Sequence, residues 1–156
     1  MALCIVARGD NVAIPRNAII AVTGNGSWSW TLTSRLCQML SQAESLYGPQ
    51  DPGYILVGWE LTTESQPNIT LRPVAKSQTR IIVQLTTNCF TFPLKAEFQM
   101  AHEVIHALSP RGRGTSNVLE EGIAVNFSIE YCRMLGLSIP PEIMITDHWH
   151  PIGPII

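Results

Sequence analysis

Apolar residues gather in short runs along much of the first ninety residues of the chain. Each run is bounded by Gly, Asn, Pro or another turn-forming residue, which is the pattern typical of β-strands. We expect strands over five such runs: 2–7, 17–23, 54–61, 69–74 and 80–86. A polar turn at Lys76-Ser77-Gln78 separates the last two.

Longer stretches carry apolar residues at helical spacing. In the first, an apolar residue recurs every three or four positions from Leu32 to Leu46, and Gly48-Pro49 ends the pattern. A second helix is expected from Pro93, because the fixed φ and missing N–H of proline suit the first turn of a helix. This helix should extend to about Leu108.

A third helix is predicted after Asn117, which is a favourable N-cap residue. Glu120 follows three residues later and completes the pattern of a capping box, and Gly136 is a natural stop. Strands and helices are therefore segregated in the second half of the chain. This order favours an α+β fold over a parallel α/β fold.

Length and charge narrow the class of protein. The chain of 156 residues fits one domain spanning residues 1–156, and folding at this size buries roughly 70% of the unfolded surface. Charged residues make up 14% of the chain, below the usual ~25%, which indicates a compact globule rather than disorder. With a net charge of −2, we expect no nucleic-acid partner.

Nothing in the sequence predicts a membrane partner or an exported protein. No apolar run approaches about 18 residues, the length that a membrane span requires. The apolar residues 2–6 have no positive region before them and are followed by Arg8 and Asp10, unlike a signal peptide. We expect a cytoplasmic protein, although non-classical secretion stays open. The cysteines contain no CxxC pair and are expected to be reduced and mostly buried: Cys4, Cys37, Cys89 and Cys132.

The second predicted helix contains the segment His102-Glu103-Val104-Ile105-His106. Two histidines four residues apart lie about 40° apart around a helix, one turn above the other, so their imidazoles can converge on one ion. Glu103 lies on a neighbouring face, where it could reach a water activated by the metal without binding the metal itself. The spacing predicts a zinc site, although it also occurs by chance on ordinary helices with two hydrogen-bonded histidines.

The surroundings of this segment strengthen the prediction. The helix is apolar nearly all round, so it should be buried. A buried carboxylate and two buried imidazoles are costly unless they are paired, hydrogen-bonded or bound to a metal. Since no Lys or Arg lies three or four residues from Glu103, a metal site is the simplest compensation.

A catalytic zinc site usually has three protein ligands and a fourth position for water. Two adjacent glutamates, Glu120 and Glu121, open the next helix and are followed by Gly122-Ile123-Ala124. Here the chain resembles the gluzincins, zincin-like metallopeptidases in which a second helix carries a glutamate ligand followed by Gly, any residue and Ala. The resemblance covers about residues 98–126. It implies a zincin-like fold, with a mixed or antiparallel sheet packed on the HExxH helix, and Zn²⁺ held by His102, His106 and Glu121.

Two departures from that family stand out. Only 14 residues (107–120) separate His106 from Glu121, fewer than in the large gluzincin enzymes. Val125 stands where thermolysin-like members carry an aspartate that supports a zinc ligand, so Glu120 or Asn126 would have to supply that support. The resemblance also implies that the strand at 80–86 forms the edge of the cleft and pairs with an extended peptide.

Several further residues are candidates for substrate or oxyanion binding. His148 and His150 in the C-terminal segment, and Tyr131 in the third helix, could stabilise a tetrahedral oxyanion. Arg111 and Arg113 could hold a substrate carboxylate. For the C-terminal histidines and the arginines we favour the simpler interpretation of solvated polar segments.

Together these features predict a zinc metallopeptidase that hydrolyses peptide or protein substrates, with Glu103 as general base. Two alternatives stay open. One is a non-catalytic binding or regulatory protein with a zincin fold, and the intact Glu103 argues against it. The other is a toxin or effector protease domain with a single protein target.

Overall fold

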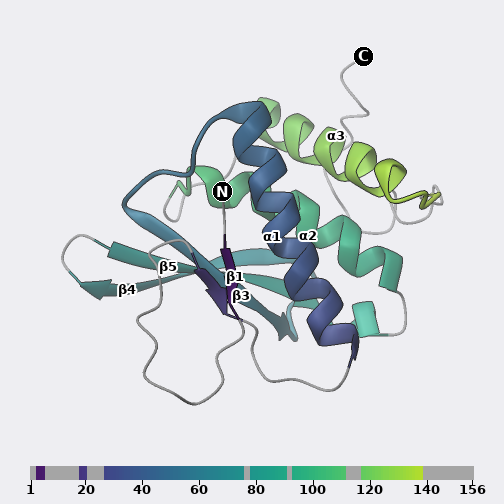
Figure 1. Cartoon of the computed structure of the whole chain (residues 1–156), viewed down its shortest axis with the longest axis horizontal. Helices are drawn as coiled ribbons and strands as arrows, with labels where there is room; N and C mark the ends of the chain where they lie inside the picture. The colour runs from purple at the N-terminus through teal and green to yellow at the C-terminus, as the bar shows by residue number, and fades with distance from the viewer. Residues whose placement is uncertain are drawn as a thin grey trace.

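A computed structural model of the chain describes residues 3–5, 18–20, 27–75, 78–90, 93–111 and 117–138. The helices gather on one side of the molecule and the longer strands on the other (Figure 1). In chain order the elements are β1 (Leu3–Ile5), β2 (Ala18–Ile20), α1 (Ser27–Tyr47), β3 (Tyr54–Thr62), β4 (Asn68–Ala75), β5 (Gln78–Thr86), the 3₁₀ helix η1 (Thr87–Phe90), α2 (Pro93–Leu108) and α3 (Val118–Met134).

All eight predicted strands and helices are present, and α2 has the predicted bounds. The predicted turn between β4 and β5 falls at Lys76 and Ser77, which lie outside the described residues. The short 3₁₀ helix between β5 and α2 was not predicted. The architecture is therefore α+β, as the order of the elements indicated.

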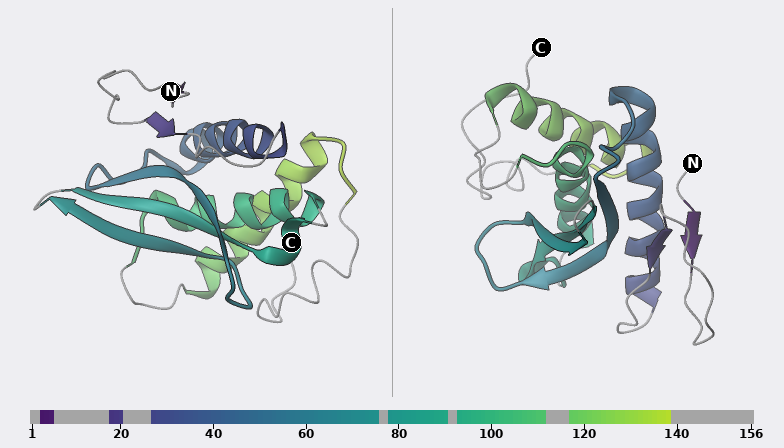
Figure 2. Two further views of the ribbon diagram at one scale, coloured as in Figure 1. Left: turned by 90° about the horizontal axis from the view of Figure 1, so that it is seen from below. Right: turned by 90° about the vertical axis from the view of Figure 1, so that its left-hand side faces the viewer.

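The main sheet has the order β3-β5-β4 and is mixed. β5 pairs with β3 in parallel and with β4 in antiparallel fashion, and Figure 2 shows the twist of these strands. The two short strands β1 and β2 form a separate parallel pair, which contacts α1.

The prediction that the strand at 80–86 forms an edge is wrong, because β5 is the central strand. Its two edges are paired with β3 and β4, and Ile81, Val83 and Leu85 are fully buried on one of its faces. β4 is an edge strand of this sheet, with Arg72 and Pro73 exposed. Proline suits an edge strand. Its missing N–H costs no hydrogen bond to the neighbouring strand when that position of the backbone faces outward.

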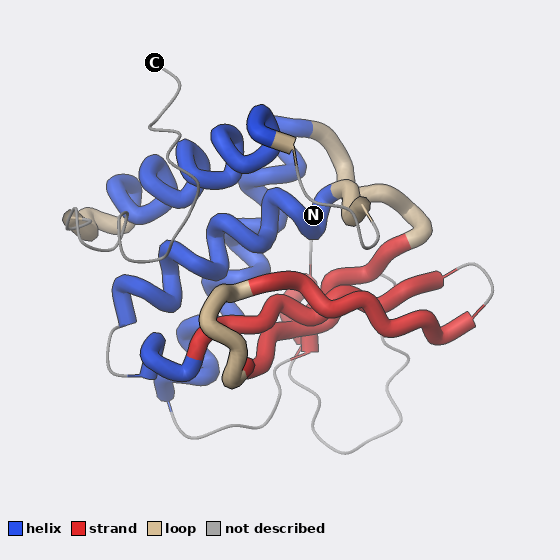
Figure 3. The backbone as a smooth tube through the Cα atoms, turned by 180° about the vertical axis from the view of Figure 1, so that it is seen from behind, coloured by secondary structure: helices blue, strands red, loops and turns tan. Residues whose placement is uncertain are grey.

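Helix α2 lies at the centre of the molecule, in contact with α1, α3 and β5 (Figure 3). Twelve of its sixteen residues are buried, as the apolar pattern all round this helix predicted. Glu97, His102 and Glu103 are therefore set into the core, and His106 is partly buried. None of the described helices has the length and apolar character needed to cross a lipid bilayer.

Helix α3 begins at its predicted cap. Asn117 is extended (φ −83°, ψ 162°), and its side chain accepts a hydrogen bond of 2.9 Å from the backbone N–H of Glu120. The helix ends before Gly136, whose φ of 72° falls in the left-handed region that favours glycine. Ala124 and Phe127 are buried on the face of α3 that packs against the rest of the core.

Three cysteines have described side chains, and all three are buried: Cys37, Cys89 and Cys132. None of them forms a disulfide. This agrees with the prediction of reduced, buried thiols.

Candidate metal centre

His102 and His106 on α2 and Glu121 on α3 come together in one group. One possible ligand atom from each residue lies within 4.8 Å of the others. The histidines converge because four residues make about one helical turn, and their ring centroids are 4.9 Å apart. Glu121 joins them because the first turn of α3 packs against the second half of α2. Within the described residues this is the one such group of three or more potential ligands.

The spacing of the donor atoms suits a tetrahedral metal ion. The two Nε2 atoms are 3.0 Å apart, His102 Nε2 is 3.2 Å from Glu121 Oε2, and His106 Nε2 is 3.5 Å from Glu121 Oε1. Ligands bound to one zinc ion at 2.0–2.1 Å with tetrahedral angles lie about 3.3 Å from one another. The three side chains are therefore spaced closely enough to hold such an ion.

Glu120 determines which nitrogen of His106 faces this group. Its Oε1 atom lies 2.9 Å from His106 Nδ1, and a carboxylate can only accept a hydrogen bond. We therefore assign the proton of the neutral ring to Nδ1. The lone pair of Nε2 then points at His102 and at the Glu121 carboxylate, an arrangement of acceptors that a cation or a proton must bridge.

The role of Glu120 corrects part of the capping prediction. The Asn117 half of the capping box is present, but the Glu120 carboxylate contacts His106 instead of completing the box. The other oxygen, Oε2, lies 3.4 Å from Arg111 Nε, an ion-pair contact without hydrogen-bond alignment. Arg111 is thus paired rather than simply solvated. Since Asn126 is exposed, Glu120 is the better of the two residues considered as support for a zinc ligand.

His102 is 1% exposed and is held in its neutral form. Burial, opposed by the hydrogen bond that the imidazole donates to the Glu121 carboxylate, lowers the pKa of His102 to about 4. At neutral pH the imidazole therefore keeps the uncharged state that metal binding requires.

Glu103 is 3% exposed, as the apolar helix predicted. Burial raises the pKa of Glu103 well above its usual value, and the nearby Glu121 carboxylate raises it further. Glu103 is not a member of the three-residue ligand group. A carboxyl group in this position retains a proton more readily than one in water.

Of the remaining candidates, the described residue Tyr131 does not join the site. Tyr131 is fully buried, and its hydroxyl donates a hydrogen bond of 3.4 Å to Gln38 Oε1 on α1, so we no longer assign it to the oxyanion. His148, His150 and Arg113 lie outside the described residues.

Removing the Glu120 carboxylate should weaken metal binding without abolishing it. In Glu120→Ala, His106 loses the partner that selects its tautomer, and we expect zinc affinity to fall about 10–100-fold. Asn126→Ala, an exposed substitution on the same helix, is the control and should bind zinc like the wild type. Competition with a chromophoric chelator measures both. Equal affinities for the two variants would contradict the supporting role of Glu120.

Helices α2 and α3 bring His102, His106 and Glu121 together as a group that could hold a metal ion, within a mixed α+β architecture. Glu121, rather than Glu120, faces both histidine Nε2 atoms. Comparison of the chain with protein-family models, curated proteins and solved structures found no match, so these side chains themselves carry what is inferred about function.

Proposed function

We propose that this protein is a zinc-dependent hydrolase that cleaves peptide bonds. The observation that carries the proposal is the convergence of three donor atoms, from His102, His106 and Glu121, at the spacing of a tetrahedral ion. Two imidazoles and one carboxylate are a donor set that zinc favours, and three protein ligands leave a fourth position for substrate or water.

The chain's own residues would carry out the proton transfers of the hydrolysis. Zinc, when bound, would lower the pKa of a water molecule towards ~7 and polarise the scissile carbonyl. Glu103 follows the ligand His102 directly, so it is placed to take up the proton of the attacking water. The proton is then returned to the leaving amine. Burial of Glu103 keeps bulk water from competing for that proton.

The sheet offers a place for an extended peptide. β4 is an edge strand, it contacts α2, and no described strand pairs with its outer side. A substrate strand can add to such an edge through main-chain hydrogen bonds. Pro73 lacks an N–H, so the donors for this pairing would come from the part of β4 before it. β4 thus takes the role that the sequence had suggested for the strand at 80–86.

Metal content and proteolysis together test the proposal. We expect about one zinc per chain by mass spectrometry, together with cleavage of casein or a peptide library that a chelator blocks and added zinc restores. Absence of bound zinc after reconstitution would contradict it. Stoichiometric zinc with no cleavage of any substrate in the panel would instead favour the non-catalytic binding protein.

A further inference from the structure

A second cluster of polar side chains lies at the other end of the contact between α2 and α3 and reaches from the core to the surface, because Glu97 and Tyr131 are buried, Arg35 is partly exposed and Gln38 is exposed. Its centre is Glu97 on α2, which is 8% exposed. Arg35 Nε on α1 lies 3.6 Å from Glu97 Oε1, whereas Glu97 Oε2 has no hydrogen-bond partner within the described part of the chain. A buried carboxylate with a single, loosely placed cation is an unusual feature of a core.

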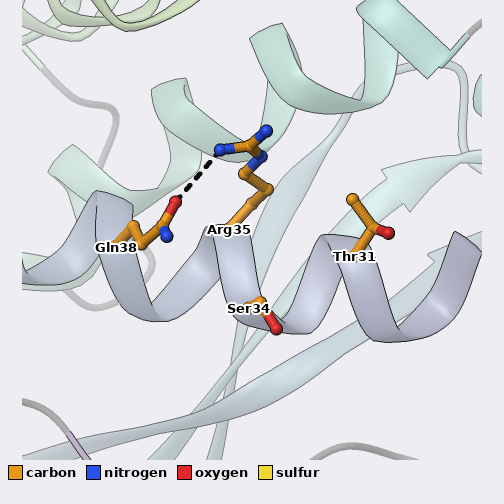
Figure 4. A pocket seen from close by; sticks show the side chains of 4 residues that line it. All are labelled: Thr31, Ser34, Arg35 and Gln38. Carbon is orange, nitrogen blue, oxygen red and sulfur yellow. Dashed lines mark hydrogen bonds between the residues drawn. The ribbon is translucent and has the colours of Figure 1, made fainter. Parts of the chain in front are cut away.

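The cluster joins all three long helices. Gln38 on α1 accepts hydrogen bonds from Arg35 (3.2 Å) and from the hydroxyl of Tyr131 on α3 (3.4 Å) through the same oxygen. Figure 4 shows Arg35 and Gln38 projecting from one side of α1, beside a hollow of about 270 Å³. Glu97 supplies the contact with α2. We call Arg35, Gln38, Glu97 and Tyr131 the polar lock.

The carboxylate of Glu97 is the costly member of the polar lock to bury. Burial, opposed by Arg35, raises the pKa of Glu97 to about 7. Burial and the Glu97 carboxylate raise the pKa values of Tyr131 and Cys132 to about 12. Replacing such a buried ion pair by apolar side chains is often neutral or stabilising, so stability alone does not explain these residues. Directional polar contacts do offer one thing that apolar packing lacks, which is a defined register between helices.

Register matters here because α3 carries a metal ligand. α2 and α3 run antiparallel: His102 and His106 face Glu121 near one end, and near the other end Glu97 on α2 and Tyr131 on α3 are both tied to α1, through Arg35 and Gln38. Ala101 on α2 and Ala124 on α3 are buried in the same core, together with the large side chain of Phe127. A shift of α3 by one residue moves Glu121 by about 1.5 Å. Metal ligands tolerate only about 0.2 Å.

We propose that the polar lock sets the register of α3 on α2 and thereby positions Glu121 against the two histidines. The register is a property of the fold itself, whereas its effect on the metal rests on the proposed function. Arg35, Glu97 and Tyr131 are thus positioning residues that act through α3.

The test removes the charge pair as a unit. In Arg35→Met/Glu97→Met no charge is left unpaired, and we expect a melting temperature equal to or above that of the wild type. Hydrogen exchange of the first two turns of α3 should nevertheless be at least about tenfold faster. The zinc affinity should fall by at least about tenfold. The matched control is Glu130→Met/Arg133→Met, which removes the exposed ion pair of α3 and should change neither quantity.

Each outcome decides one question. If the double variant has the hydrogen-exchange rates in α3 and the zinc affinity of the wild type, the polar lock does not set the register. Should that variant fail to fold, Tyr131→Phe removes a single hydroxyl and the same two measurements decide, with unchanged exchange and affinity overturning the proposal. If the wild type binds no zinc, the proposed function fails, and the exchange of α3 still tests the register.

Discussion

Substituting Glu103 with glutamine is expected to abolish most peptide hydrolysis while leaving zinc bound. Glutamine preserves the shape of a side chain that is 3% exposed, so the helix and its histidines should keep their places. It cannot accept the proton of the attacking water, and loss of a general base lowers rates by about 10²–10⁴-fold. The substitution also removes a buried carboxylate beside Glu121, whose charge raises the pKa of Glu103, so stability should not fall.

Three measurements on Glu103→Gln check this expectation: zinc content, thermal unfolding and kcat/KM on the best peptide found for the wild type. Glu130→Gln, the same change at an exposed position of α3, is the control and should keep full activity. A Glu103→Gln protein that retains zinc and hydrolyses the peptide at the wild-type rate would show that another group accepts the proton.

Replacing Glu121 with alanine is expected to remove the metal and the activity together. The Glu121 carboxylate is the single donor that α3 contributes to the ligand group, within 3.2 Å of His102 and 3.5 Å of His106. Loss of a residue that only supports a ligand lowers metal affinity by at most about 100-fold. Loss of Glu121 itself should lower the zinc affinity by more than that. His102→Ala should have the same double effect, because it removes a ligand from α2.

Comparison with Glu120→Ala decides between the two adjacent glutamates. Chelator competition under identical conditions should give the highest zinc affinity for the wild type, a lower one for Glu120→Ala and the lowest for Glu121→Ala. The reverse order of the two variants would make Glu120 the ligand and Glu121 its support. Zinc binding by Glu121→Ala at wild-type strength would remove α3 from the metal centre altogether.

Local signals in the sequence were sufficient for the secondary structure. Helix α2 begins at Pro93 and ends at Leu108 as predicted, because a proline-compatible first turn and the apolar pattern act over a few residues. Asn117 caps α3 for the same reason. The convergence of His102 and His106 also follows from the helix alone, since a spacing of four residues places both rings on one face.

The partners of a strand are not a local property. The apolar run in β5 predicts a buried strand, but it contains nothing that specifies β3 on one side and β4 on the other. We therefore predicted the edge of the sheet at the strand that became β5. The exposed Arg72 and Pro73 of β4 were the better indication of an edge strand.

The sequence did contain a signal that Glu97 is a buried carboxylate. Like Glu103, it interrupts an apolar helix and has no Lys or Arg three or four residues away. The same reasoning that identified the metal centre could have flagged a second buried carboxylate. Its partner, Arg35, lies 62 positions earlier in the chain (97 − 35), so only the folded protein reveals it.

The sequence by itself determined the helices, the strands and the pair of histidines, because these depend on spacing within one turn or one pleat. Tertiary structure decided that β5 is central, that the Glu120 carboxylate serves His106, and that Arg35 and Tyr131 meet around Glu97. Each of these depends on how separate elements pack in space. Contacts between residues far apart in the chain leave no periodic pattern that a single sequence could display.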